Sequence, residues 1–325
     1  MKKILKRLAV AIGALVVLAV FGVIVKFYAL SPASRAAPAM TAPSSPEVIE
    51  RGRYLAHHVA GCIACHSPVQ ESVPGEPPVE SMIGAGRDFG DLPGMPARIR
   101  PGNITPDKKT GLGAWTDGEI VRAMREGVSR DGRALFPQMP YTMYAKNLSD
   151  DDALAIVAYL KTLKPIENNP GPTEVDFPVS MFMRAAPQPL EASPPPPPPA
   201  TDAMARGKWL LQMCLCAECH DSVDSRHQKI SGMELAGGMK FPLPGRRGVA
   251  IAPNITSDKA TGVGAYSDED LRRAIEHGKS KDGRDLYVMP WTYYRGLTVE
   301  DRAALLLALR QVPAVANSVP PSQIK

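Results

Sequence analysis

The stretch Cys62-Ile63-Ala64-Cys65-His66 and its second copy, Cys216-Ala217-Glu218-Cys219-His220, decide how the rest of the chain is interpreted. Cys-x-x-Cys-His is the pattern at which a haem is attached covalently. Its two thiols reach the vinyl groups of the porphyrin, and its histidine lies under the iron. A bare Cys-x-x-Cys also fits a zinc half-site or a redox dithiol, but the histidine that follows both copies favours haem. The motifs predict two covalently bound haem c groups, with porphyrin attachment and proximal iron ligation by Cys62, Cys65, His66, Cys216, Cys219 and His220.

Length and composition suit a chain of two small domains with additional segments. The chain has 325 residues, and its low aromatic content of 6% fits cores that are partly filled by a porphyrin. Its 33 prolines predict long irregular loops or linkers. The formal net charge of +5 includes a basic N-terminal cluster and omits the haem propionates. The folded part is therefore near neutral or acidic, and no nucleic-acid partner is expected.

One of the five cysteines, Cys214, lies outside both motifs. Free cysteine is among the most buried residue types, so a small buried apolar residue is the expectation here. The alternative is a thiol beside the second haem that mispairs during attachment. A disulfide scaffold is excluded by this count.

The N-terminus carries an apolar run of 18 residues, Leu8 to Val25, after four basic residues. Such a helix is about 27 Å long, enough to cross a hydrocarbon core, and its basic flank should stay in the cytoplasm. Residues 1–30 are therefore predicted to be a single-pass anchor in a bacterial inner membrane, with the haem domains in the periplasm. The alternative is a cleaved signal peptide, for which Ala36-Ala37-Pro38-Ala39 is a poor cleavage site. Residues 31–45 are expected to form a flexible tether.

An internal repeat relates the two halves of the chain at a shift of 151 residues, the separation of Asn103 and Asn254. Two diverged copies of one domain are predicted, at 46–164 and 201–312. The matched segments are Leu92-Pro93-Gly94 with Leu243-Pro244-Gly245, Asn103-Ile104-Thr105 with Asn254-Ile255-Thr256, Thr110–Trp115 with Thr261–Tyr266, Asp131-Gly132-Arg133 with Asp282-Gly283-Arg284, and, after a one-residue deletion, Met139-Pro140-Tyr141 with Met289-Pro290-Trp291.

Helix starts are readable in both copies from capping-box patterns, and no alternating strand pattern of useful length occurs. Both domains are therefore predicted to be all-α. A glycine followed by a large aromatic before each motif indicates a close helix crossing, since glycine lacks a Cβ. These residues are Gly52 with Tyr54 and Gly207 with Trp209, and the capped starts are Thr116-x-x-Glu119, Ser149-x-x-Asp152, Ser267-x-x-Asp270 and Thr298-x-x-Asp301.

The segment between the copies, 165–200, has no helical period and ends in the six prolines Pro194 to Pro199. Six prolines favour an extended polyproline helix, a stiff spacer of roughly 19 Å. An SH3-type ligand is the alternative. Residues 313–325 are expected to be a disordered tail.

The sixth iron ligand decides between electron transfer and catalysis, because a thioether closes the site whereas an empty position lets oxygen or peroxide bind. The repeat selects Met139 and Met289 among 14 methionines: both precede a proline and an aromatic, 73 residues after His66 and 69 after His220. Met143 is close by, but Tyr293 stands at its counterpart. Met139 and Met289 are the predicted ligands.

The other histidines have no counterpart in the opposite copy, so a surface or structural role is expected for each. His57 or His58, near the first attachment site, could also hydrogen-bond to the haem or compete for iron during folding. The four are His57, His58, His227 and His277.

Repeated polar positions are candidates for holding the haem propionates, which need donors when buried. Trp115 and Tyr266 are expected to make such contacts. Asn103 and Asn254 are further candidates, although Asn-Ile-Thr is also compatible with turn chemistry. The Asp-Gly pairs that precede Arg133 and Arg284 are interpreted as turns.

Four motifs follow the first Cys-x-x-Cys-His in order: Asn-Ile-Thr-Pro-Asp, Thr-Gly-Leu-Gly-Ala-Trp, Asp-Gly-Arg-x-Leu and Met-Pro-Tyr. In this order they resemble the cytochrome c subunits of membrane-bound alcohol and gluconate dehydrogenases, over 46–164 and 201–312. The resemblance implies two tandem class-I-like cytochrome c domains behind the transmembrane helix. The chain departs from those subunits in having two haem motifs, where they typically have three, and in its N-terminal membrane segment.

The resemblance implies a membrane-tethered electron carrier with no catalytic side chain. Its donor would be a periplasmic dehydrogenase of quinoprotein, flavoprotein or molybdenum type. Its acceptor would be the quinone pool, another cytochrome or a terminal oxidase. Two alternatives are a dihaem enzyme, either a peroxidase or a sulfur-oxidising cytochrome with an open haem, and the haem subunit of a haem–copper oxidase.

Overall fold

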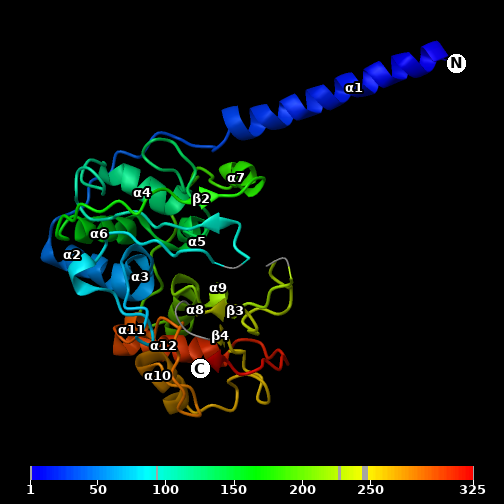
Figure 1. Ribbon diagram of the computed structural model, residues 1–325. Helices are drawn as coiled ribbons and strands as arrows, with labels where there is room; N and C mark the ends of the chain where they lie inside the picture. Colours follow the sequence, from blue (N-terminus) through cyan, green and yellow to red (C-terminus); the bar gives the residue numbers. More distant parts are fainter. Residues whose placement is uncertain (1, 93, 226–227, 244–247, 325) are drawn as a thin grey trace.

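A long helix projects from a mostly helical body in the computed structural model, which describes residues 2–92, 94–225, 228–243 and 248–324 (Figure 1). Helix α1 (Lys2–Ile24) continues into a π-helical turn, η1 (Val25–Ala29), and none of its residues is buried. Among the described residues, one helical segment, Lys2–Ala29, is long and apolar enough to cross a membrane, and a signal sequence would meet the same criteria. The predicted features at Pro93, His227, Pro244 and Gly245 lie outside the described residues.

The first half of the body is built from short helices whose starts are capped as the sequence predicts. The Thr116 hydroxyl accepts from the Glu119 N–H while the Glu119 carboxylate accepts from the Thr116 N–H, and Ser149 caps the last helix. The elements are α2 (Pro46–Tyr54), the π-turn η2 (Leu55–Val59), α3 (Cys62–His66), the 3-10 turn η3 (Glu80–Met82), α4 (Asp117–Glu126), α5 (Tyr141–Asn147) and α6 (Asp150–Leu160).

The second half repeats the same succession of helices. Ser267 and Asp270 form the second capping box, and Thr298 caps the last helix. The elements are α8 (Ala203–Met213), α9 (Cys216–His220), α10 (Asp268–His277), α11 (Trp291–Tyr294) and α12 (Val299–Arg310), after α7 (Val179–Phe182) and the 3-10 turn η4 (Met183–Ala185) in the connecting segment.

Within each half, the helix before the Cys-x-x-Cys-His motif crosses the last helix at very close range. A Cβ on Gly52 would lie 1.8 Å from the carbonyl oxygen of Ala155, and one on Gly207 would lie 2.0 Å from that of Ala304. Because only glycine permits this approach, the predicted close crossing is confirmed in both halves. An ion pair accompanies each crossing, Arg51 to Asp152 at 2.9 Å and Arg206 to Asp301 at 2.7 Å.

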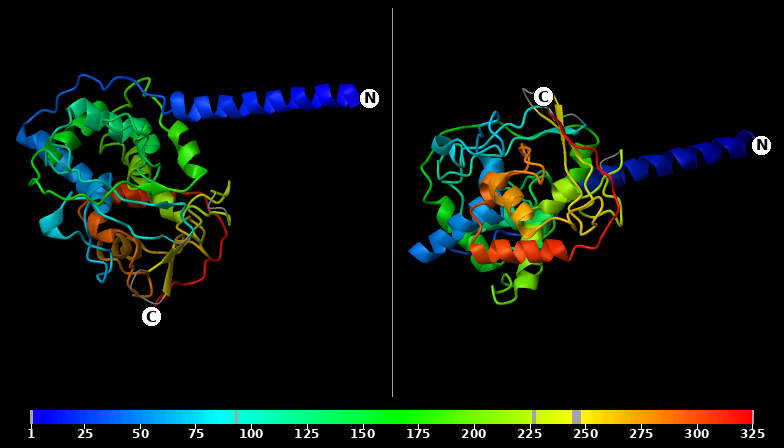
Figure 2. Two further views of the ribbon diagram at one scale, coloured as in Figure 1. Left: turned by 45° about the horizontal axis from the view of Figure 1, so that its top comes forward. Right: turned by 90° about the horizontal axis from the view of Figure 1, so that it is seen from below.

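The halves pack on one another rather than being held apart (Figure 2). The Trp209 indole Nε1 donates to the Asn147 carbonyl at 3.0 Å, and the Tyr54 hydroxyl donates to the Asp301 carboxylate at 2.5 Å. The Thr292 hydroxyl donates to the Gly75 carbonyl at 2.7 Å.

Short antiparallel strands occur in the loops, where the sequence predicts none. They are too short for an alternating pattern to show. The pairs join β1 (Ala97–Arg98) to β2 (Glu174–Val175) and β4 (Gly248–Ile251) to both β3 (Lys240–Pro242) and β5 (Gln323–Ile324).

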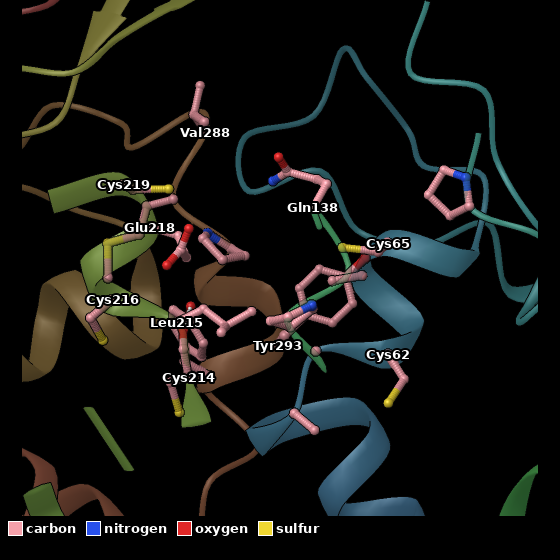
Figure 3. Close-up of a pocket in the computed structure, with 18 of the residues that line it drawn as sticks. Cys62, Cys65, Gln138, Cys214, Leu215, Cys216, Glu218, Cys219, Val288 and Tyr293 are labelled. Carbon is pink, nitrogen blue, oxygen red and sulfur yellow. Dashed lines mark hydrogen bonds between the residues drawn. The ribbon is translucent and has the colours of Figure 1, made fainter. Parts of the chain in front are cut away.

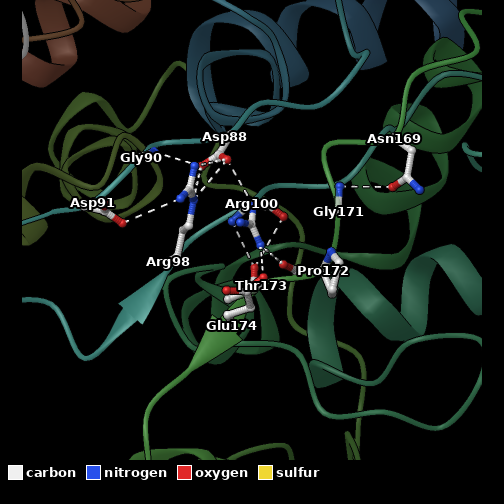
Figure 4. Close-up of polar contacts among 10 residues, drawn as sticks. All are labelled: Asp88, Gly90, Asp91, Arg98, Arg100, Asn169, Gly171, Pro172, Thr173 and Glu174. Carbon is white, nitrogen blue, oxygen red and sulfur yellow. Dashed lines mark hydrogen bonds and ion pairs between the residues drawn. The ribbon is translucent and has the colours of Figure 1, made fainter.

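The start of the segment 165–200 is bound to the first half of the body. Arg100 donates to the Pro172 carbonyl and the Glu174 carboxylate, both at 2.7 Å, and Asp88 binds Arg98 and Arg100 (Figure 4). Together with the β1–β2 pair, these contacts tie the start of the segment to the first half.

The predicted tether and the predicted tail both make contacts with the folded body. Arg35 in the tether donates to the buried carboxylate of Glu126, and the N–H of Ala42 donates to Asp117 at 2.8 Å. These acidic groups of α4 are buried and need partners, which the tether supplies. The tail lies along the second half, where the Asn317 side chain donates to the Ala236 carbonyl at 2.8 Å. In the first half, the Asn168 side chain makes the matching hydrogen bond to the Ala85 carbonyl. Asn168 and Asn317 are therefore a repeated pair that the sequence-based prediction missed.

Candidate functional site

A single cavity of about 1480 Å³ lies between the two halves and is lined by both. Pockets for small ligands usually measure about 300–1,000 Å³, so this cavity has room for more than one ordinary ligand. All the site residues predicted from the sequence line it: Cys62, Cys65, His66, Asn103, Trp115, Met139, Cys216, Cys219, His220, Asn254, Tyr266 and Met289.

The two Cys-x-x-Cys-His motifs occupy the single-turn helices α3 and α9, on opposite sides of this cavity (Figure 3). Each helix begins directly after a left-handed residue, Gly61 with φ 67° and Leu215 with φ 57°. This left-handed residue turns the chain sharply into the helix, so that both cysteines and the histidine lie on one helical turn. Leucine rarely adopts this conformation, so the second turn is held by its surroundings at a cost in backbone strain.

Both motif histidines are oriented by a backbone carbonyl at the same place in the repeat. His66 Nδ1 lies 2.7 Å from the Gly102 carbonyl oxygen, and His220 Nδ1 lies 2.8 Å from that of Pro253. Burial lowers the pKa of both imidazoles. A hydrogen bond from Nδ1–H to a carbonyl fixes the tautomer that leaves Nε2 free for a metal, so the arrangement fits an axial iron ligand.

Asn103 organises the loop that carries the Gly102 carbonyl. Its amide donates to the Thr110 hydroxyl at 2.9 Å and the Ile166 carbonyl at 2.7 Å, and its oxygen accepts from the N–H and hydroxyl of Thr105. Asn254 makes the same contacts, to Thr261, Val315 and Thr256. The amide donors are thus engaged within the chain, and the propionate contact expected of the two asparagines stays a prediction. The repeat aligns the threonines in the sequence without assigning them a role, and it misses Asn168 and Asn317, which a longer repeat alignment would have matched.

Trp115 and Tyr266 differ from the asparagines, because no hydrogen bond of the indole N–H or the phenol O–H is found within the part of the chain that the structure describes. Both side chains are half-buried and line the cavity. The Lys281 ammonium lies 4.8 Å from the centroid of the Tyr266 ring. Their polar hydrogens can therefore serve a ligand in the cavity.

The two selected methionines stand on matching turns. The Tyr141 N–H at the start of α5 donates to the Met139 carbonyl at 2.8 Å, and the Trp291 N–H at the start of α11 donates to the Met289 carbonyl at the same distance. Both methionines are half-buried against the core and line the cavity. Met143 also lines it, so the preference for Met139 rests on the repeat.

The leftover cysteine and the unmatched histidines have partners in the protein. Cys214 is 3% exposed within the apolar core, as expected of a small buried residue. His57 Nε2 lies 2.5 Å from the Tyr159 hydroxyl, and His58 Nδ1 lies 2.7 Å from the Tyr293 carbonyl oxygen. Burial lowers the pKa of His57 to about 4. His277 is largely exposed at the end of α10.

Residues 49–164 match the family model for cytochrome c. They form a cytochrome c domain. This part of the chain contains the first Cys-x-x-Cys-His motif, and the match supports a covalently bound haem c. The oriented His66 and the apolar cavity above it fit this group.

Similar proteins extend the match beyond that domain. The fructose dehydrogenase cytochrome subunit of Gluconobacter japonicus is 30% identical over 87% of this chain and 57% of its own length. The gluconate 2-dehydrogenase cytochrome c subunit of Pantoea cypripedii is 29% identical over 72% of this chain and 52% of its own. A "Diheme cytochrome c-type" protein of Cereibacter sphaeroides is 29% identical over 78% of this chain and 83% of its own.

These similarities confirm the resemblance to dehydrogenase cytochrome c subunits that the motifs indicate. The names are those of cytochrome subunits, which agrees with an electron-transfer component rather than a catalytic subunit. The chain spans a little over half the length of the two dehydrogenase subunits.

Proposed function

We propose that the chain is a membrane-tethered dihaem cytochrome c that relays single electrons from a periplasmic dehydrogenase to a later respiratory acceptor. The observation that carries the proposal is the shared cavity with two matched sets of lining residues. Each set consists of a Cys-x-x-Cys-His turn, a carbonyl-oriented histidine, an Asn-x-Thr loop and a methionine two residues before a short helix. When bound, haem supplies the one-electron couple, and the chain sets its position, exposure and potential.

The second half, residues 201–312, would be a second class-I-like cytochrome c domain in tandem with the first. Its support is the repeated hydrogen-bond geometry: the carbonyl before Asn254 meets His220 as the carbonyl before Asn103 meets His66. Cys216 and Cys219 would attach the second haem. His66 with Met139, and His220 with Met289, would hold the two irons in closed sites.

The arrangement of the halves supports direct exchange of electrons inside the molecule. Tyr293 is 5% exposed and lies between the two cysteine pairs (Figure 3). Its hydroxyl donates to the Glu76 carbonyl of the other half at 3.3 Å. Because the halves share one cavity and are joined around it, the relay would not depend on the polyproline segment bringing separate domains together.

The ligand assignment is tested by absorption spectroscopy of the holoprotein. Two haems per chain and a methionine–iron charge-transfer band of two-haem intensity are expected in the oxidised protein. Met139→Ala and Met289→Ala should each remove half of that band, while the matched Met143→Ala should leave it intact. Loss of the band in Met143→Ala would reassign the first ligand. A high-spin haem in the unmodified protein would favour the dihaem enzyme.

The donor is proposed from the dehydrogenase subunits that the chain resembles, and the acceptor from the respiratory role that this resemblance implies. Helix α1 would hold the cytochrome at the inner membrane with both haems in the periplasm. A dehydrogenase subunit encoded in the neighbouring reading frames is the expected finding. Large membrane subunits of a haem–copper oxidase, in the neighbouring frames or co-purifying with the chain, would overturn this assignment.

A further inference from the structure

The end of α1 is flanked by a patch of exposed aromatic and apolar side chains that the haem sites do not use. We call it the aromatic patch and define it as Tyr28, Leu30, Phe177 and Phe182, which are 53%, 69%, 76% and 53% exposed. Phe177 and Phe182 come from the segment between the two haem-bearing halves. Among the described residues outside α1, they are the two exposed phenylalanines.

The two chain segments of the patch are joined by direct contacts. The rings of Phe27 and Phe182 meet edge to face with centroids 5.2 Å apart. Arg184 Nε donates to the Phe27 carbonyl at 2.8 Å, and the Arg184 guanidinium lies 5.2 Å from the centroid of the Tyr28 ring. Figure 1 shows α7 beside the end of α1. The patch is therefore one surface, although its parts are about 150 residues apart in the chain.

Two basic side chains lie at the rings of the patch. Lys26 and Arg184 stack near Phe27 and Tyr28, whereas the exposed Asp176 precedes Phe177 and Arg35 is paired with Glu126. Helix α1 is about 35 Å long at 1.5 Å per residue, slightly more than the roughly 30 Å hydrocarbon core. A helix that crosses the bilayer from Lys2 thus brings η1 to the level of the headgroups. Aromatic side chains gather at that level because one part of the ring is apolar and the other tolerates water.

We propose that the aromatic patch rests in the headgroup region of the bilayer that α1 crosses, as a second membrane contact of the folded body. This inference rests on the proposed function, since it requires α1 to be retained and inserted. The occupant is a lipid surface because the patch continues the membrane segment itself and exposes aromatic rings beside the basic side chains of Lys26 and Arg184.

The contact fixes the orientation of the first haem domain. On one side the tether holds the domain through Arg35 and the buried Glu126. On the other side the segment after residue 165 is held by the β1–β2 pair and the bond from Arg100 to Glu174. Two attachments to the same bilayer, one before and one after the domain, restrict rotation about the axis of α1.

Site-directed cross-linking of the full-length holoprotein tests the contact. A benzophenone amino acid is introduced at Phe177, and as a matched control at Val299, an apolar residue 68% exposed at the start of α12. The protein is reconstituted into vesicles of phosphatidylethanolamine and phosphatidylglycerol, irradiated and analysed for lipid adducts by mass spectrometry. We expect a several-fold higher adduct yield at Phe177 than at Val299. Equal yields overturn the proposal.

A third labelled position separates this inference from the proposed anchoring. Phe21 lies within α1, so the label there forms adducts whenever α1 is inserted. Adducts at Phe21 without adducts at Phe177 refute the second contact alone. No adducts at Phe21, together with an intact mass lacking the N-terminal segment, refute the anchor as well.

Haem orientation gives a second measurement that does not depend on labelling. In oriented bilayers, linear dichroism of the haem bands should be strong in the wild type and weaker in the double variant Phe177→Ser, Phe182→Ser, with haem content and membrane retention unchanged. An unchanged dichroism would show that the patch does not set orientation and would overturn that part of the proposal.

Discussion

The Tyr54 hydroxyl of one half donates a hydrogen bond of 2.5 Å to the Asp301 carboxylate of the other. The same carboxylate receives two bonds from Arg206, at 2.7 and 2.9 Å, and Asp301 is 3% exposed. Trp209, the counterpart of Tyr54 in the repeat, reaches back to the Asn147 carbonyl just before α6. Each matched aromatic therefore extends from its own half to the start of the last helix in the other half.

Replacing Asp301 should destabilise the protein more than replacing its counterpart Asp152. The Arg206 side chain is 10% exposed, so Asp301→Asn leaves its guanidinium buried without a counter-charge. The free energy of unfolding should fall by about 3–5 kcal/mol. Asp152→Asn should cost less, because the Arg51 side chain is 31% exposed and water can replace its partner. Urea unfolding of the two holoproteins, followed by circular dichroism, measures the difference. Equal losses would contradict the special role of Asp301 between the halves.

The Asp301 carboxylate should also make stability depend on acid pH. Burial alone would raise the pKa of Asp301, but the hydrogen bonds from Arg206 and Tyr54 outweigh it and hold the pKa below its ordinary value of 3.8. A group whose pKa is lowered by folding adds stability above its unfolded pKa and loses it as pH falls through the folded pKa. The difference in unfolding free energy between wild type and Asp301→Asn should therefore be constant near pH 6 and shrink below about pH 3.8. A difference that grows on acidification would refute this.

The sequence predicts local features of this fold better than its long-range contacts. The close helix crossings at Gly52 and Gly207 could be predicted, because a residue without a Cβ lets two helices approach wherever they cross. The partners of Tyr54 and Trp209 could not be predicted, because the repeat shows that a position matters within each copy and not how the copies pack. The contact of the tether with α4 could not be predicted for a related reason: Arg35 belongs to no periodic pattern, and its partner Glu126 is 91 residues away.

At the candidate haem site, too, local features could be predicted from the sequence and long-range contacts could not. From the repeat, Met139, Met289, Trp115 and Tyr266 could be chosen as candidates, and all four line the cavity, while iron ligation by the two methionines stays a prediction. The repeat gives no information about which donors are free, because that depends on carbonyls such as that of Ile166, which lie outside the aligned segments.

Adding a methyl group at either helix crossing should disrupt the half that contains it. Gly207→Ala places a Cβ 2.0 Å from the Ala304 carbonyl oxygen, so α8 and α12 must separate. Overpacking of this kind costs about 1–3 kcal/mol and sometimes more. Gly52→Ala should act likewise on α2 and α6. Thermal unfolding of the holoproteins, with the exposed Lys208→Ala on the same helix α8 as control, measures the effect. A melting temperature for Gly207→Ala equal to that of Lys208→Ala would mean that the crossing is loose.

Removing the free donors of Trp115 and Tyr266 should lower the reduction potential of one haem each. Trp115→Phe and Tyr266→Phe delete an N–H or O–H while keeping an aromatic ring in the cavity wall. If the donor binds a propionate, its loss leaves that negative charge less neutralised, which favours the oxidised, more positive iron. The expected shift is on the order of the 59 mV that corresponds to a tenfold change in a one-electron equilibrium. Spectroelectrochemical titration of the two haems measures it.

Asn103→Ala provides the contrasting variant, because the amide of Asn103 is engaged with Thr110 and the Ile166 carbonyl. Its loss leaves buried partners unsatisfied, which costs about 1–3 kcal/mol of stability, and loosens the loop that carries the carbonyl facing His66. We therefore expect a lower melting temperature for Asn103→Ala and little change in melting temperature for Trp115→Phe. The reduction potentials could instead stay unchanged in both aromatic variants and shift strongly in Asn103→Ala, with normal stability of that variant. This result would assign the propionate contacts to the asparagines instead of the aromatic residues.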